Sequence, residues 1–202
     1  MSAPRRPGCR RLSRVQRPAR KRPPGASSGH GPDPGDVDIA VRAMISQLQA
    51  DEWALLRELR LAALTESPDA FSPTAESTAL LAEDDWRASA ERFGTSPAAA
   101  MFIARPDQGL MSAVKDAGGI GHIGAMWVSP TARGQKLGSA LLDEGMRFLE
   151  ASGCGQIELS VTETNLTARR LYESRGFVLT GESEPLRKGS ALANLFMRRG
   201  NT

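Results

Sequence analysis

Cysteine and histidine are scarce in this chain of 202 residues, which contains two of each. Cys9 and Cys154 form no CxxC pair and no disulfide framework, so the sequence predicts a cytoplasmic protein in a reducing compartment. His30 and His122 are the only imidazoles and no HExxH motif is present, so we expect no metal site. A Ser-His-Asp hydrolase is also disfavoured, because no serine lies in a G-x-S-x-G elbow.

Long apolar runs are absent as well. None approaches the roughly 18 consecutive apolar residues that a membrane-spanning helix requires. Arg and Pro stand near the N-terminus, where a signal peptide would have its apolar stretch. We therefore expect no membrane contact and a soluble, intracellular protein.

Acidic residues are missing from one end of the chain. Residues 1–30 hold nine of the 26 basic residues and none of the 23 acidic ones, so the remainder has six more acidic than basic residues. Residues 1–36 contain seven Pro and five Gly with few large apolar groups, which predicts a disordered basic tail. This tail is either an arm that contacts nucleic acid or a solvated extension; the lack of aromatic residues to stack on bases favours the extension. The folded domain is expected over residues 37–202.

Beyond the tail, apolar residues alternate between strand and helix spacing. A helix capped by Asp51 is expected to end before Pro68, and further helices are predicted over 83–92, 134–151 and 166–175. Strands are predicted over 38–44, 101–104, 110–114, 122–128, 157–161, 177–182 and 193–198, the second to fourth forming a meander. The fold class is therefore α+β, with a mixed sheet.

The segment most informative about chemistry leads from the meander into the long helix. It reads MWVSPTARGQKLGS over residues 126–139, so a strand enters a basic, glycine-containing turn that opens directly into the helix. The first N–H groups of a helix lack intrahelical partners and carry the positive end of the helix dipole. The turn thus indicates an anion site suited to a diphosphate, with charge added by Arg133 and Lys136. It matches neither a Walker A loop nor a dinucleotide fingerprint.

This turn resembles the acetyl-CoA-binding motif of the GNAT acetyltransferase family, Q/R-x-x-G-x-G/A. Arg133 and Gly138 match its ends, whereas Lys136 replaces the Gly that the family usually has. A second segment, the strand at 157–161 followed by Asn165 and a helix that ends Y-x-x-x-G-F at 172–177, resembles the family's next strand and helix. The resemblance covers roughly residues 38–199.

The resemblance implies a GNAT-like twisted mixed sheet of about seven strands, flanked by about four helices, in which strands four and five splay apart to admit pantetheine. It implies direct transfer of acetyl from acetyl-CoA, a co-substrate, to a primary amine. The residues that would bind acetyl-CoA are Met126, Trp127, Val128, Arg133, Gly134, Gln135, Lys136, Leu137, Gly138, Ser139, Asn165 and Tyr172.

Several roles stay open at this point. Tyr172 takes the family's general-acid position, or else packs along its helix with its hydroxyl at the cofactor rim. Asn165 contacts CoA or caps the following helix, and the Lys136 side chain reaches a phosphate or strains the turn through its Cβ. His122 or Glu163 would serve as general base, directly or through water.

The acceptor amine is not readable from the sequence, although Glu182 and Glu184 would favour a cationic one. Exposed strand edges make a homodimer plausible. The rival interpretation is a noncatalytic acyl-CoA-binding or regulatory module, which would need neither Tyr172 nor a base.

Overall fold

The structure is a computed structural model that describes residues 34–200, with side chains from residue 39 onward. The predicted tail therefore lies outside the described residues as far as residue 33, and so do both of its interpretations, the solvated extension and the less favoured nucleic-acid-binding arm.

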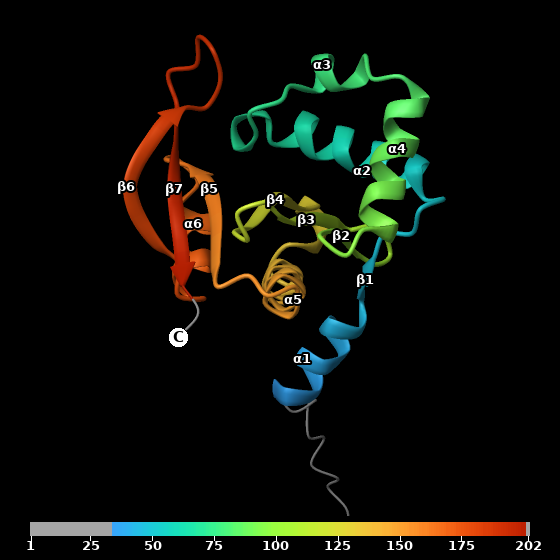
Figure 1. The fold of residues 1–202 in the computed structure, drawn as a ribbon, viewed down its shortest axis with the longest axis horizontal. Coiled ribbons are helices and arrows are strands. Elements are labelled where there is room, and N and C mark those ends of the chain that lie inside the picture. Colours follow the sequence, from blue (N-terminus) through green and yellow to red (C-terminus); the bar gives the residue numbers. More distant parts are fainter. Residues whose placement is uncertain (1–33, 201–202) are drawn as a thin grey trace, which may run out of the picture. The chain divides into compact units, whose positions relative to one another are not determined.

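A single mixed sheet organises the described chain (Figure 1). Its strand order is β1-β2-β3-β4-β5-β7-β6, and all neighbours are antiparallel except β4 and β5. The strands are β1 (Ile45–Gln47), β2 (Ala99–Ala104), β3 (Gly109–Lys115), β4 (Gly121–Val128), β5 (Gln156–Thr162), β6 (Val178–Pro185) and β7 (Ala193–Gly200). The α-helices are α1 (Pro34–Ala43), α2 (Trp53–Glu66), α3 (Ala75–Ala79), α4 (Glu83–Thr95), α5 (Leu137–Ala151) and α6 (Leu166–Glu173). The predicted α+β class and seven strands are confirmed.

Helices cover both faces of the first half of the sheet, with α5 on one side and α2 and α4 on the other (Figure 1). Strand β2 is buried along its whole length, as a strand between two helical layers must be. Its alternate side chains enter two core clusters: Phe102 joins the one under α5, and Met101 and Ile103 join the one under α2 and α4.

The parallel pair at the centre of the sheet is short. β4 and β5 pair only over Gly121–Ile123 and Ile157–Leu159, and the two strands then diverge. The remainder of β4 pairs with β3 alone. The predicted splaying of the fourth and fifth strands is thus present, and it opens the sheet at the end toward which β4 runs.

The prediction of a strand over 38–44 is wrong: residues 38–43 belong to α1, and the edge strand β1 begins at Ile45. Alternation of Ile39, Val41 and Ala43 does not bury one face, because Ile39 is 70% exposed. Val41 and Met44 pack against the core instead, and their spacing of three residues is helical.

Two helix starts also differ from prediction. The N-cap of α2 is Glu52 rather than Asp51, and it makes no side-chain cap; its carboxylate pairs with Arg105 at 2.7 Å. Helix α5 begins at Leu137 rather than at residue 134, because Gly134 and Lys136 have positive φ angles that a helix cannot include. Helices α1 and α3 bring the number of α-helices among the described residues to six, where about four were expected.

Candidate active site

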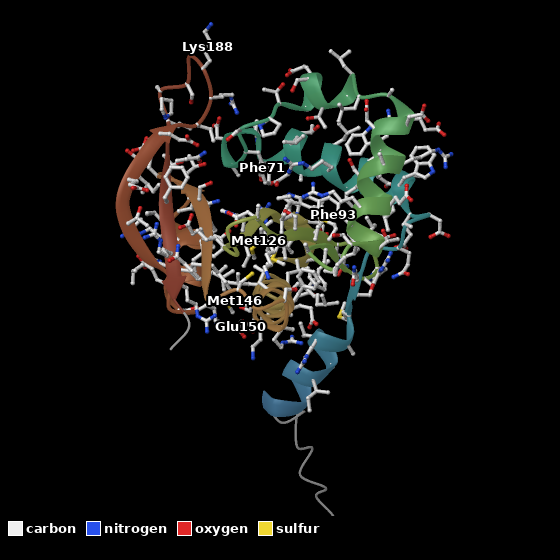
Figure 2. All side chains as sticks on the ribbon, in the orientation of Figure 1. Phe71, Phe93, Met126, Met146, Glu150 and Lys188 are labelled. Atoms are coloured by element: carbon white, nitrogen blue, oxygen red, sulfur yellow. The ribbon has the colours of Figure 1, made fainter. Side chains whose placement is uncertain are left out.

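The divergence of β4 and β5 opens a cavity of about 770 Å³. It is bounded by β4, the turn before α5, the end of β5, α6 and the loop after α2. Figure 2 shows two of its lining residues, Phe71 beside the end of α2 and Met126 on β4. Of the predicted acetyl-CoA-binding residues, those that line it are Met126, Trp127, Val128, Arg133, Gly134, Lys136, Leu137, Gly138, Ser139, Asn165 and Tyr172. Gln135 does not, and its amide donates a hydrogen bond to the Thr131 carbonyl instead.

The turn before α5 holds two left-handed residues. Gly134 has φ +81°, and Lys136, the N-cap, has φ 62° and ψ 5°. The family's usual Gly in place of Lys136 would suit this conformation, because a residue with a Cβ pays roughly 1–2 kcal/mol there. The turn keeps this left-handed geometry, and the first residues of α5, whose N–H groups lack intrahelical partners, line the cavity.

A bulge interrupts β4 beside the cavity. Leu110 of β3 faces Trp127 and Ser112 faces Gly124, so two residues of β4, Ala125 and Met126, stand opposite one residue of β3. Ala125 adopts φ 51° to make this bulge. Because β5 has already diverged, main-chain groups here are not committed to a regular ladder on either side. The sequence offered only the small Gly124-Ala125 pair as a signal.

Glu66, at the end of α2, anchors the turn and was not found by sequence analysis. Its Oε2 accepts hydrogen bonds from the Ser67 hydroxyl, from Trp127 Nε1 at 3.0 Å and from Arg133 Nη2 at 2.6 Å. Arg133 Nε also donates to the Val128 carbonyl at 3.1 Å. One carboxylate thus ties α2 to the end of β4 and holds Arg133 in place.

Hydrogen bonds from Ser67, Trp127 and Arg133 outweigh burial and lower the pKa of Glu66 from 4.5 to about 2. A depressed carboxylate pKa stabilises the folded state above the unfolded value and ceases to do so as pH falls through the folded value. Glu66→Gln should therefore cost stability near neutral pH, and this cost should shrink between about pH 4.5 and 2. Urea unfolding at several pH values measures it, with Glu58→Gln, an exposed position on the same helix, as control. A cost that does not change with pH would show that the charge of Glu66 is unimportant.

Tyr172 projects from α6 into the cavity and is 6% exposed. Its hydroxyl points at Met126 Sδ, 3.6 Å away on the bulged part of β4, and its ring packs edge-on against Phe177. Burial raises the pKa of Tyr172 from 10 to about 12. The phenol therefore keeps its proton throughout the neutral range.

This pKa is directly measurable because Tyr172 is the only tyrosine in the chain. The ultraviolet absorbance of phenolate should appear with a midpoint near 12 in the folded protein and near 10 in denaturant. Since the folded state keeps its proton longer, unfolding should become easier as pH rises above 10. A native midpoint of 10 would mean that the hydroxyl faces solvent.

Neither candidate base lines the cavity. His122 lies at the start of β4, where its Nε2 is 2.8 Å from Asp116 Oδ2 and its side chain is 45% exposed. Glu163 is exposed beyond the end of β5, and its Oε1 accepts a hydrogen bond from the Ala193 N–H at 3.0 Å. Asn165 lines the cavity and also caps α6, since its Oδ1 accepts from the Ala168 N–H at 3.1 Å.

The far end of the cavity is formed by the loop after α2, which distant residues hold in place. Arg187, in the β6–β7 connection, donates from Nη1 to the Phe71 carbonyl at 2.9 Å. Buried Thr162 donates to the Asp69 carbonyl at 2.8 Å, and buried Asn194 donates to Ser72 Oγ at 3.3 Å. The loop is thereby tied to β5 and β7.

The charge of the cavity wall is one-sided. Arg60, Arg133 and Lys136 line it, and no described Asp, Glu or His does. Glu182 and Glu184 are exposed on β6 and do not line it, so the described cavity does not supply the expected preference for a cationic amine.

Two kinds of feature are absent from residues 34–200. No helix there is long and apolar enough to cross a membrane, and no group of three or more His, Cys, Asp or Glu could hold a metal ion.

Comparison with known sequences connects this site to a family. A family model described as Acetyltransferase (GNAT) family matches residues 49–177. The mycothiol acetyltransferase of Stackebrandtia nassauensis is 33% identical over 134 residues, which are 63% of this chain and 41% of that protein. This chain thus spans about two fifths of that relative's length.

Solved structures share the fold. An acetyltransferase of the GNAT family from Streptococcus pneumoniae matches with a TM-score of 0.68 at 21% identity, over 78% of this chain and 98% of that one. The Salmonella typhimurium protein yncA, solved with its cofactor acetyl-CoA, matches with a TM-score of 0.64 at 18% identity, over 77% and 92% of the two chains.

Proposed function

The chain belongs to the GNAT acetyltransferase family, and from this premise we propose that it transfers the acetyl group of acetyl-CoA to a primary amine. One observation carries the proposal: a single cavity runs from the basic turn before α5 along the bulged end of β4 to the buried side chain of Tyr172. Such a cavity can hold an extended thioester at one end and expose its acyl group to a second substrate at the other.

The residues present fit acetyl-CoA, which would supply an acetyl group activated by a sulfur leaving group. The first N–H groups of α5, with Arg133 and Lys136, would bind its diphosphate. Main-chain groups of Trp127 and Val128 would bind the pantetheine amides where β5 has diverged from β4. The bulge at Ala125 would leave a nearby N–H group to polarise the acetyl carbonyl.

Tyr172 would act as the general acid. Its burial keeps the phenol protonated, so the hydroxyl can donate to the departing sulfur. The exchange balances: a nitrogen–carbon bond forms as the carbon–sulfur bond breaks, the amine gives a proton to water, and Tyr172 gives one to sulfur and regains it from solvent.

The proton of the acceptor amine has no carboxylate or imidazole to receive it on the described cavity wall. We therefore propose that the amine enters uncharged or loses its proton to water, and that neither His122 nor Glu163 accepts this proton directly. The positive wall favours this, because nearby cations lower the pKa of an ammonium group.

The noncatalytic interpretation is less well supported, because a binding module would not need a buried phenol in its cavity. A cytoplasmic location and a homodimer stay predictions.

Incubation of the full chain with acetyl-CoA and a panel of amines tests the proposal. We expect thiol release, followed with a thiol reagent, to depend on one class of amine, and mass spectrometry to find that amine acetylated. Binding of acetyl-CoA without turnover of any amine would favour the noncatalytic module.

A further inference from the structure

Arg60 is a cation without a counterion inside the cavity. It lies on α2, and its Nη1 is shielded from solvent yet has no hydrogen-bond partner among the described residues. The guanidinium carbon instead lies over the face of Phe71, 4.7 Å from the centre of the ring. Burial without a hydrogen-bond partner is costly for a charged group, and such groups are normally paired.

The surrounding wall offers no compensation. Arg133, the other arginine of the wall, is paired with Glu66 at 2.6 Å, whereas Arg60 faces no described carboxylate in the cavity. Desolvation lowers the pKa of Arg60, but a guanidinium remains protonated in proteins. Arg60 therefore carries a full positive charge in the cavity wall that an anionic ligand could neutralise.

The guanidinium is also held in place. The ring on which it lies belongs to Phe71, which is 8% exposed and whose carbonyl is bound by Arg187 at 2.9 Å. A guanidinium stacked on a fixed ring presents its remaining N–H groups as a planar fork, and that fork matches the two oxygens of a carboxylate.

We propose that Arg60 binds a carboxylate of the acceptor, so that the acceptor is an amine that also carries a carboxylate. The inference rests on the proposed acetyl transfer and names its substrate class. The ligand of Arg60 is the acceptor rather than a phosphate of CoA, because Arg60 lies against the loop after α2, while the turn before α5 has Arg133 and Lys136 of its own.

The test compares α-amino acids, β-alanine and γ-aminobutyrate with their carboxamides, which keep the amine and lose the charge. The full chain is assayed for thiol release with acetyl-CoA. Thermal unfolding of the CoA-saturated protein with each compound reads binding without turnover. Arg60→Met is compared with Arg57→Met, which removes an exposed arginine from the same helix.

At least one acid should exceed its carboxamide by about 100-fold or more in kcat/KM and should raise the unfolding midpoint when its carboxamide does not. Arg60→Met should abolish both differences, because it should lower the kcat/KM and the midpoint shift of the acid and leave those of the carboxamide unchanged. Arg57→Met should preserve both differences. Without any ligand, Arg60→Met should unfold no earlier than the parent, because it removes an unpaired charge.

Equal kcat/KM values for the acids and their carboxamides would overturn the inference. An unfolding midpoint that no acid raises would overturn it as well. Preferred acetylation of amines that lack a carboxylate, such as spermidine or an amino phosphate, would overturn it and leave acetyl transfer intact. Acids that bind through Arg60 without being acetylated would support the carboxylate site and count against the proposed function.

Discussion

Replacing Tyr172 with phenylalanine should lower kcat by about 100-fold or more, the usual contribution of a positioned general acid. Among the described residues the hydroxyl forms a hydrogen bond only with Met126 Sδ, at 3.6 Å, so its removal should leave the fold and the affinity for acetyl-CoA nearly unchanged. A loss confined to kcat would assign the phenol to chemistry rather than to binding. Steady-state kinetics, together with a calorimetric titration of acetyl-CoA, separates the two.

The matched controls for this variant are His122→Ala and Glu163→Ala. Both side chains lie outside the cavity, so we expect kcat to change by less than about 3-fold and its pH profile to keep the parental shape. If Tyr172→Phe retained most of the activity, the phenol would be a packing residue. If either control removed the acidic limb of the pH profile, where protonation of a general base lowers the rate, that residue would be the base after all.

Gly138→Glu should weaken acetyl-CoA binding by about 100-fold or more. Gly138 lies in the first turn of α5 and lines the cavity, where a carboxylate would replace bound phosphate at the positive end of the helix. The fold should survive, because a Cβ at this position would meet its nearest neighbour, Met126 Cε, at 3.4 Å, an ordinary contact.

Gly155→Glu is the control for this variant, with the same change of residue and charge. A Cβ at Gly155 has no atom within 4 Å, and the residue does not line the cavity. Calorimetry should give parental affinity for this control. Comparable weakening in both variants would mean that the protein's net charge, and not the turn, governs binding.

The parts of the fold that the sequence predicts well have short-range causes. Alternation in Ile157, Leu159 and Val161 gives β5, and all three side chains are buried. The basic turn and Tyr172 lie in local motifs, so their meeting in one cavity could be expected from the resemblance. The prediction of a first strand over 38–44 was wrong because Ile39, Val41 and Ala43 fit both a short strand and part of a helix.

What the sequence could not predict depends on contacts between distant residues. Glu66 and Arg133 are 67 residues apart, and nothing near Glu66 indicates that it anchors the turn. The significance of Arg60 likewise arises only when Phe71 folds back beneath it and the wall proves to lack a carboxylate. The conformation of Ala125 follows from a mismatch of register between two strands, which no local pattern specifies.

Thermal unfolding of the full chain with and without acetyl-CoA tests the central claim most directly. A ligand that binds only the folded state stabilises it, by about 2.7 kcal/mol at 100 times its Kd, and so raises the midpoint. We predict a clear rise with acetyl-CoA that CoA reproduces, NAD does not, and Gly138→Glu abolishes. No rise at millimolar acetyl-CoA would contradict the account, because the cavity between β4 and β5 would then not be an acetyl-CoA site.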